Sequence, residues 1–124
     1  MVPPDSDWTI VFYLDESESS PVADFLNGLD RKTRVRFVWS IEQLRLRNVQ
    51  AREPLVRHLS DKLWELRQES GKNIYRVVYV FAAGKLIVLI HGFQKKTQRT
   101  PRGELAVAQA RFNDFVSRSA RGET

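Results

Sequence analysis

The chain has 124 residues, 42% of them hydrophobic, which suffices for one domain with a single core and leaves no room for a second. It contains no Cys and only two His, which excludes a disulfide framework, thiolate chemistry and the usual zinc sites. The net charge of +5 is unevenly spread, because residues 1–30 hold seven acids and no base, so that residues 31–124 carry all 20 Lys and Arg and a net charge of +12.

The basic part of the chain favours a polyanionic partner. Each Lys or Arg that neutralises a phosphate releases condensed counterions, so a basic surface of this kind is typical of nucleic-acid binding. The alternative is a solvated surface that only aids solubility. Because every apolar run is shorter than about 18 residues and the first residues lack a basic and then apolar leader, we expect a cytoplasmic protein without a membrane span.

The first 50 residues predict one strand and two helices. Residues 8–14 (WTIVFYL) are aromatic and β-branched and predict a strand. Ser20 followed by Pro21 is a typical helix start, and the helix that it opens ends near Gly28. A second helix is predicted over residues 31–48. Its apolar stripe, which we expect to be buried, is Phe37, Val38, Ile41 and Leu44.

After Pro54 the apolar period changes from that of a helix to that of strands. Residues 63–67 (LWELR) and 75–81 (YRVVYVF) alternate between two faces. Residues 86–93 (LIVLIHGF) are apolar on both faces, as is typical of a central strand. A turn at Ala83-Gly84 joins the last two strands in a hairpin.

The chain closes with an amphipathic helix that begins near Pro101, and residues 117–124 predict a disordered tail. The helix residues expected to face inward are Leu105, Ala108, Phe112, Phe115 and Val116. The order of elements predicts a single α+β domain over residues 1–124, a mostly antiparallel sheet of about four strands with two N-terminal helices and one C-terminal helix on one face. The sequence does not reveal the neighbour of the first strand, although a right-handed crossover would make the two parallel.

Cations gather at the ends of the three predicted consecutive strands. Arg67 ends one strand and Arg76 begins the next, so an antiparallel connection makes them neighbours. Lys95 and Lys96 follow the third strand, which returns toward Arg76. Because Arg76 stands in an apolar strand, either its face is partly open or it has an anion of its own. The four cations are thus predicted to lie within reach of one phosphate.

The sequence lacks the motifs of common enzymes, such as a nucleophile beside a base, a glycine-rich phosphate loop or a metal-ligand cluster. The segments LWELR and YRVVYVFAAGKLIVLIHGFQKKTQRTP, followed by the amphipathic helix, resemble the RelE/HigB superfamily of toxins from type II toxin–antitoxin pairs, specifically its phage-derived Gp49-like branch. WELR, YR and HGFxKKTxxTP are the specific part of this resemblance. It implies an α+β RelE-like fold and an endoribonuclease, an mRNA interferase that inhibits translation on the ribosome without a metal or other cofactor. The implied partners are the ribosome, mRNA and a helix-turn-helix (HigA/Xre-like) antitoxin.

By position, the resemblance assigns Arg67, Arg76, Lys95 and Lys96 as the catalytic cations. RNA supplies its own nucleophile, the 2′-hydroxyl, so the protein need only hold the phosphate and move protons. Arg suits the phosphate oxygens, and a Lys of lowered pKa suits the proton transfer, with either lysine in that role. Further RNA-binding candidates are Arg31, Lys32, Arg45, Arg47, Arg99, Arg102 and His58.

The general base and the class of toxin stay open at this point. Relatives place a Tyr or His near the last helix, whereas no Tyr or His follows Pro101 here. His91 lies within an apolar run and is interpreted as a core histidine. The alternative function is a non-catalytic binding toxin, either a ParE-like gyrase inhibitor or a protein that docks on ribosomes. Because convergent cations serve phosphate chemistry and a gyrase inhibitor needs only a binding surface, we favour the nuclease.

Overall fold

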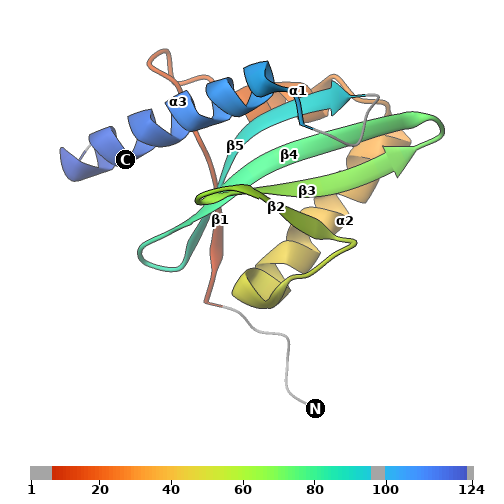
Figure 1. Ribbon diagram of the computed structural model, residues 1–124, viewed down its shortest axis with the longest axis horizontal. Coiled ribbons are helices and arrows are strands. Elements are labelled where there is room, and N and C mark those ends of the chain that lie inside the picture. The colour runs from red at the N-terminus through yellow and green to blue at the C-terminus, as the bar shows by residue number, and fades with distance from the viewer. Residues whose placement is uncertain (1–6, 96–99, 123–124) are drawn as a thin grey trace.

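The computed structural model describes residues 7–95 and 100–122. Its elements are β1 (Thr9–Phe12), α1 (Pro21–Asn27), α2 (Arg31–Arg47), η1 (Asn48–Gln50), β2 (Val56–Ser60), β3 (Leu63–Ser70), β4 (Asn73–Ala82), β5 (Leu86–Lys95) and α3 (Arg102–Ala120), as Figure 1 shows. The predicted α+β class is confirmed, with three helices and five strands in place of about four. None of the helices in this described part of the chain has the length and apolar composition that a membrane crossing requires.

The five strands form one mixed sheet in the order β1-β5-β4-β3-β2. Strands β2 to β5 are antiparallel neighbours. Strand β5 also pairs with β1, in parallel, with Val88 opposite Val11. The crossover through α1, α2 and the other strands therefore makes the first strand parallel to the last. The predicted hairpin at Ala83-Gly84 is confirmed, with Gly84 at a positive φ of 87° that a residue without Cβ adopts at little cost.

The strand that the sequence analysis missed is β2 at the edge of the sheet. Its sequence, VRHLS, is short and contains three polar side chains, and only Val56 is buried. An edge strand has one hydrogen-bonding partner, so its side chains are less constrained to be apolar.

The helices cover both faces of the sheet, which corrects the prediction that they lie on one. Helices α1 and α2 pack on the face that carries Val77, Tyr79 and Leu89, here called the α2 face. Helix α3 packs on the opposite face, here called the α3 face, against Val78 and Val88. Figure 1 shows the sheet between α2 and α3. A strand apolar on both sides, such as β5, is what two covered faces require.

Four local expectations about the helices can be compared with the structure. Ser20 caps α1, accepting a hydrogen bond from the Ala23 amide at 3.1 Å, as predicted. Val38 is 57% exposed, so the prediction that it belongs to the buried stripe of α2 is wrong. Val116 of α3 is also exposed, at 49%, contrary to the prediction. Because α3 continues to Ala120, the tail predicted over residues 117–124 is helical in its first four residues.

Candidate active site

Three arginines on three neighbouring strands share the α3 face near the β3–β4 turn. Arg57 of β2 lies opposite Glu65 of β3, and Arg67 of β3 lies opposite Arg76 of β4. The sequence prediction that Arg67 and Arg76 are neighbours is confirmed. The register also makes Glu65 the diagonal neighbour of Arg76 on the same face, within reach of a long side chain.

Glu65 is the common anion of this arginine cluster. Its carboxylate pairs with the Arg76 guanidinium and lies 3.5 Å from Nε of Arg57. Its Oε1 accepts a hydrogen bond from the Thr100 hydroxyl at 3.1 Å. Glu65 and Arg76 are both fully buried, and a buried charge pair persists only when further polar contacts support it. Thr100, just before α3, therefore connects the start of this helix to the cluster.

Arg76 is a buried cation rather than a residue of an open face. Its side chain is 0% exposed, so the expectation of an open face is wrong, and the alternative that it has an anion of its own is confirmed, with Glu65 as that anion. Burial, together with the smaller effect of the nearby charge of Arg57, lowers the pKa of Arg76 to about 10. Arg76 is still protonated at neutral pH.

Arg57 and Arg67 carry the accessible positive charge of the cluster. Their side chains are 35% and 28% exposed. Arg67 pairs with Glu69 at 3.1 Å, but the Glu69 side chain is 63% exposed, and a pair of this kind contributes little. An incoming phosphate can therefore compete for the Arg67 guanidinium.

The predicted lysines follow the cluster along the backbone. Lys95 is the last residue of β5 and lies in register with Ile74, two positions beyond Phe93, which is opposite Arg76. The end of β5 thus lies at the same end of the sheet as Arg67 and Arg76. Lys96 and Arg99 lie outside the described residues. Arg102 is exposed at the first position of α3.

The basic residues of α2 lie on the other side of the sheet. Arg31 and Lys32 are exposed in the first turn, and Arg45 and Arg47 are in the last turn. Arg45 is paired with Glu42 at 2.6 Å. These four predicted RNA-binding residues belong to the layer that covers the α2 face. Of the four, Arg47 lines a hollow together with Arg67 of the arginine cluster.

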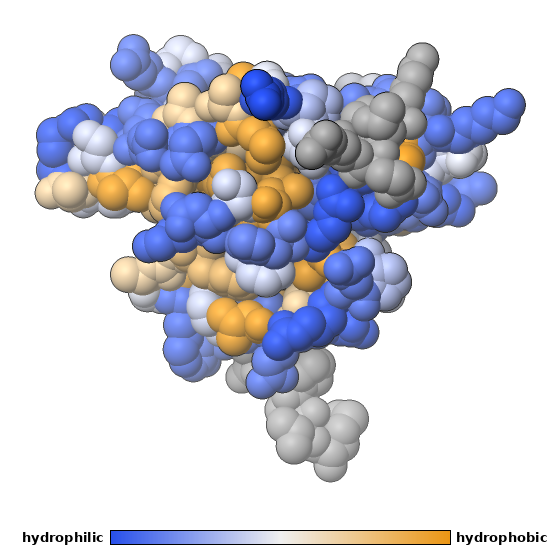
Figure 2. Space-filling model, viewed as in Figure 1, coloured by the Kyte–Doolittle hydropathy of each residue, from blue (hydrophilic) through white to orange (hydrophobic). Residues whose placement is uncertain are grey.

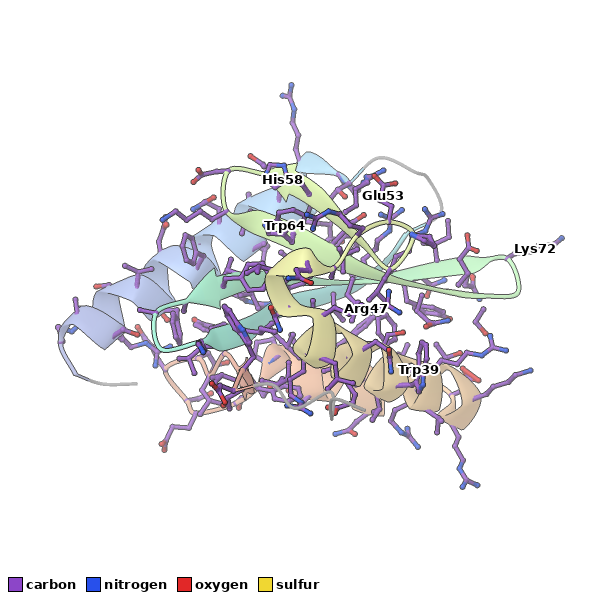
Figure 3. All side chains as sticks on the ribbon, turned by 90° about the horizontal axis from the view of Figure 1, so that it is seen from below. Trp39, Arg47, Glu53, His58, Trp64 and Lys72 are labelled. Carbon is purple, nitrogen blue, oxygen red and sulfur yellow. The ribbon has the colours of Figure 1, made fainter. Side chains whose placement is uncertain are left out.

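His58 lies on β2, the strand that also carries Arg57. Its ring packs edge to face on Trp64 at 4.9 Å, as Figure 3 lets the reader follow, and its Nε2 lies 2.6 Å from the Asp61 carbonyl oxygen. With Arg57 and Thr100, His58 also lines a hollow of about 220 Å³ at the edge of the sheet. His58 is therefore beside the cluster, while its ring is engaged on the α2 face.

His91 has a partner at each ring nitrogen. Arg111 donates to Nδ1 at 2.8 Å, so Nε2 carries the proton and donates to Glu104 at 2.8 Å. Burial lowers the pKa of His91, and the hydrogen bond to Glu104 only partly opposes this effect. The imidazole is buried, neutral and held between β5 and α3, which agrees with its interpretation as a core histidine.

The sequence analysis missed three members of the site: Arg57, Glu65 and Thr100. The alternation in LWELR already placed Glu65 on the same face as Arg67, and the antiparallel connection placed Arg76 opposite Arg67. Together these two signals predict the Glu65–Arg76 pair. Arg57 could not be found because its strand was not predicted. Within the described ranges, no three His, Asp or Glu side chains gather closely enough to hold a metal ion.

A family model matches most of the chain. The model of the family described as phage derived protein Gp49-like (DUF891) matches residues 24–113. The matched range includes all of α2, strands β2 to β5 and the arginine cluster, together with more than half of α1 and of α3. No curated protein matches the chain.

Proposed function

Because the chain belongs to the Gp49-like family, a family of RelE/HigB-like toxins of toxin–antitoxin pairs, we propose that this toxin is a ribosome-dependent endonuclease that cleaves mRNA. An antitoxin is its expected partner, and a helix-turn-helix protein of the HigA/Xre type is the proposed one.

The observation that supports the nuclease is the arginine cluster at one end of the sheet. Arg57, Arg67 and Arg76 come from three adjacent strands, and β5 ends beside them at Lys95. Guanidinium groups bind two phosphate oxygens at once, and a cluster held by strands is already in place when the substrate arrives. A toxin that only bound a protein would not need such a group of cations on a rigid sheet.

The proposed reaction uses the nucleophile of the RNA. The 2′-hydroxyl oxygen attacks the adjacent phosphorus and loses its proton, and the bond from phosphorus to the 5′ oxygen breaks as that oxygen gains a proton. The products are a 2′,3′-cyclic phosphate and a 5′-hydroxyl end. Arg57 and Arg67 stabilise the charge that develops on the phosphate oxygens, and Lys95 or Lys96 transfers the protons.

Arg76 and Glu65 serve this site by positioning in the proposed mechanism. Their buried pair fixes β3 against β4, and Glu65 holds Arg57 and Thr100 as well. The catalytic role predicted for Arg76 thus becomes that of a positioning residue in the free protein, while Arg67 keeps the predicted contact with the phosphate.

The test is mRNA cleavage in a purified translation reaction, mapped by primer extension. We expect Arg67→Gln to slow cleavage by about 10²-fold, since one positioned donor of transition-state charge stabilisation has about that effect. Lys85→Gln is the matched control, because Lys85 is an exposed cation at the β4–β5 turn, the other end of the sheet. Equal cleavage by both variants would contradict the nuclease site, and no cleavage by the wild type would favour the binding toxin.

A further inference from the structure

Helix α2 is apolar on two opposite sides, and only one of them is used by the core. Phe37, Ile41 and Leu44 are buried against the sheet. On the outer side, Val35 and Val38 are each 57% exposed and Trp39 is 62% exposed. A surface helix whose only task is to cover a sheet needs an apolar stripe on one side alone. The outer apolar residues therefore need a separate explanation.

The outer residues form a stripe with helical spacing, here called the outer α2 stripe. Val35, Val38 and Trp39 follow the i, i+3, i+4 pattern, and Leu46, half-buried, lies three turns beyond Val35. Val49, in η1, is 54% exposed just past the helix. Of the seven large apolar residues exposed in the described ranges, four lie between positions 35 and 49. This concentration separates the stripe from the single exposed apolar residues that every surface has.

Basic residues line the outer α2 stripe on both sides. Their helical positions place Arg34 and Arg45 along one side, and Lys32, Arg36 and Arg47 along the other. Glu42, the one acid of α2, lies within the stripe by its helical position, between Trp39 and Leu46, and is paired with Arg45. The surface is thus an apolar stripe, interrupted by this one acid–arginine pair, between two cationic rims.

A hollow continues this surface toward the sheet. It has a volume of about 300 Å³ and is lined by Trp39, Gln43, Arg47, Arg52, Pro54 and Arg67, among others. Figure 3, in which α2 lies on the near side, shows Trp39 on the exposed side of the helix and Arg47 farther along it. Trp39 therefore contributes to both the stripe and the hollow, where arginines from three segments of the chain meet.

We propose that the outer α2 stripe is the docking surface for an acidic amphipathic helix of the antitoxin. This inference rests on the proposed function for the existence of the antitoxin, and on the structure for the surface and its chemistry. Apolar residues at helical spacing fit the apolar face of a second helix, and the cationic rims fit acidic residues on either side of that face.

Charge and apolarity together argue against other occupants. A second copy of the chain would bring the same cationic rims face to face, which is repulsive. RNA would satisfy the arginines but would leave Val35 and Val38 without an apolar partner. The stripe lies in the layer that covers the α2 face, and the hollow beside it reaches the arginine cluster at Arg67. An antitoxin docked here therefore borders the proposed phosphate site at Arg67.

The test measures binding of the antitoxin candidate to the purified full chain. The candidate is the product of the gene that adjoins the gene of this toxin, here called the adjoining gene. We expect Val38→Glu, which places a negative charge in the stripe, and Trp39→Ala each to weaken binding by about 30-fold or more, as substitutions at the centre of an interface do. Val107→Glu is the matched control, because Val107 is an exposed valine of α3, on the other face of the sheet, and its variant should bind within about threefold of wild type. Thermal unfolding of each variant checks that the fold is intact.

A growth assay separates failure of this inference from failure of the proposed function. If both hold, Val38→Glu arrests growth as the wild type does, and coexpression of the adjoining gene no longer restores it. If the wild type is harmless and cuts no mRNA, the proposed function fails, and the binding measurement still decides the inference. Undiminished binding by Val38→Glu overturns the inference. Absence of binding by the wild type also overturns the inference. A third variant, Val116→Glu, changes a residue of the apolar hollow between α3 and the β4–β5 turn. If only this variant loses binding, the antitoxin docks at that hollow and the inference is overturned.

Discussion

The pairing of Arg76 with Glu65 decides which arginines of the cluster are buried and which are accessible. The sequence shows a charged residue in an apolar strand and leaves two explanations, an open face or a private anion. The choice depends in part on Thr100, a buried residue outside the strands whose hydroxyl donates to Glu65. The alternation of apolar and polar residues predicts the face of the sheet on which a side chain lies, but not what covers that face. The position of Arg76 next to Arg67 could therefore be predicted, whereas its burial could not.

Removing Arg76 alone should destabilise the protein. Arg76→Ala leaves Glu65 buried with less compensation, which costs about 3–5 kcal/mol, so we expect a correspondingly lower free energy of unfolding in urea. The double variant Glu65→Leu with Arg76→Met removes both charges and should recover most of that stability. If the double variant is stable but cuts no mRNA, the pair serves the site. A single variant as stable as wild type would contradict the buried pair.

His91 should make stability depend on pH. Its pKa is lowered in the folded protein, so between the folded value and the ordinary value of about 6.5 the unfolded chain binds more protons. Stability from this group is full above pH 6.5 and falls as the pH drops through that window. Urea unfolding should show a lower free energy of unfolding at pH 5.5 than at pH 7.5, and this difference should be smaller in His91→Gln. His58→Gln, at the exposed histidine, is the control. If the difference is as large in His91→Gln as in the wild type, another group causes it.

At the scale of elements, most helices and strands were predictable, and the exceptions have physical reasons. Strand β2 carries the weak pattern of a sheet edge, where pairing on one side supports polar residues. The buried side of α2 was assigned correctly for Phe37, Ile41 and Leu44, and Val38 was wrongly included because it continues the same apolar run. A helix with two apolar sides gives no signal for which side the sheet occupies.

Gly92 in the HGF segment is explained by the packing of α1 on β5. A Cβ at this position would lie 2.3 Å from the Phe25 ring. We expect Gly92→Ala to destabilise the protein by about 1–3 kcal/mol, because Phe25 is also packed against Phe37 and Tyr75 and cannot simply move. Chemical denaturation measures this difference. Phe25→Leu should lower the free energy of unfolding less in the Gly92→Ala background than in the wild type. If the effects of the two substitutions are additive, residue 92 and the Phe25 ring are not in contact.

For the whole molecule, the α+β class and a parallel first strand could be predicted from the sequence. The arrangement of helices on both faces of the sheet could not. The sequence led us to expect one covered face, although β5 is apolar on both. Helix α3 fills the second face, and Tyr13 fixes it there by donating to Asp114 at 2.6 Å. Figure 2, drawn from the same side as Figure 1, shows a mostly hydrophilic surface with apolar residues exposed between more polar ones.

The layering places most of each proposed surface on a different side of the sheet. By strand register the arginine cluster lies on the α3 face, and the outer α2 stripe lies on the far side of α2. Arg67 is shared by both, since it also lines the hollow beside Trp39. In the proposed arrangement the antitoxin therefore reaches the phosphate site at Arg67.

In the proposed mechanism, this toxin cuts RNA with the 2′-hydroxyl of the substrate itself. A comparison of two mRNAs in the same translation reaction tests this step, one mRNA all-ribose and one with a single 2′-deoxy nucleotide on the 5′ side of the mapped cut. We expect cleavage of the all-ribose mRNA, with a 2′,3′-cyclic phosphate end, and no cleavage of the deoxy-substituted mRNA at that position. Equal cleavage of both mRNAs would rule out the 2′-hydroxyl as the nucleophile.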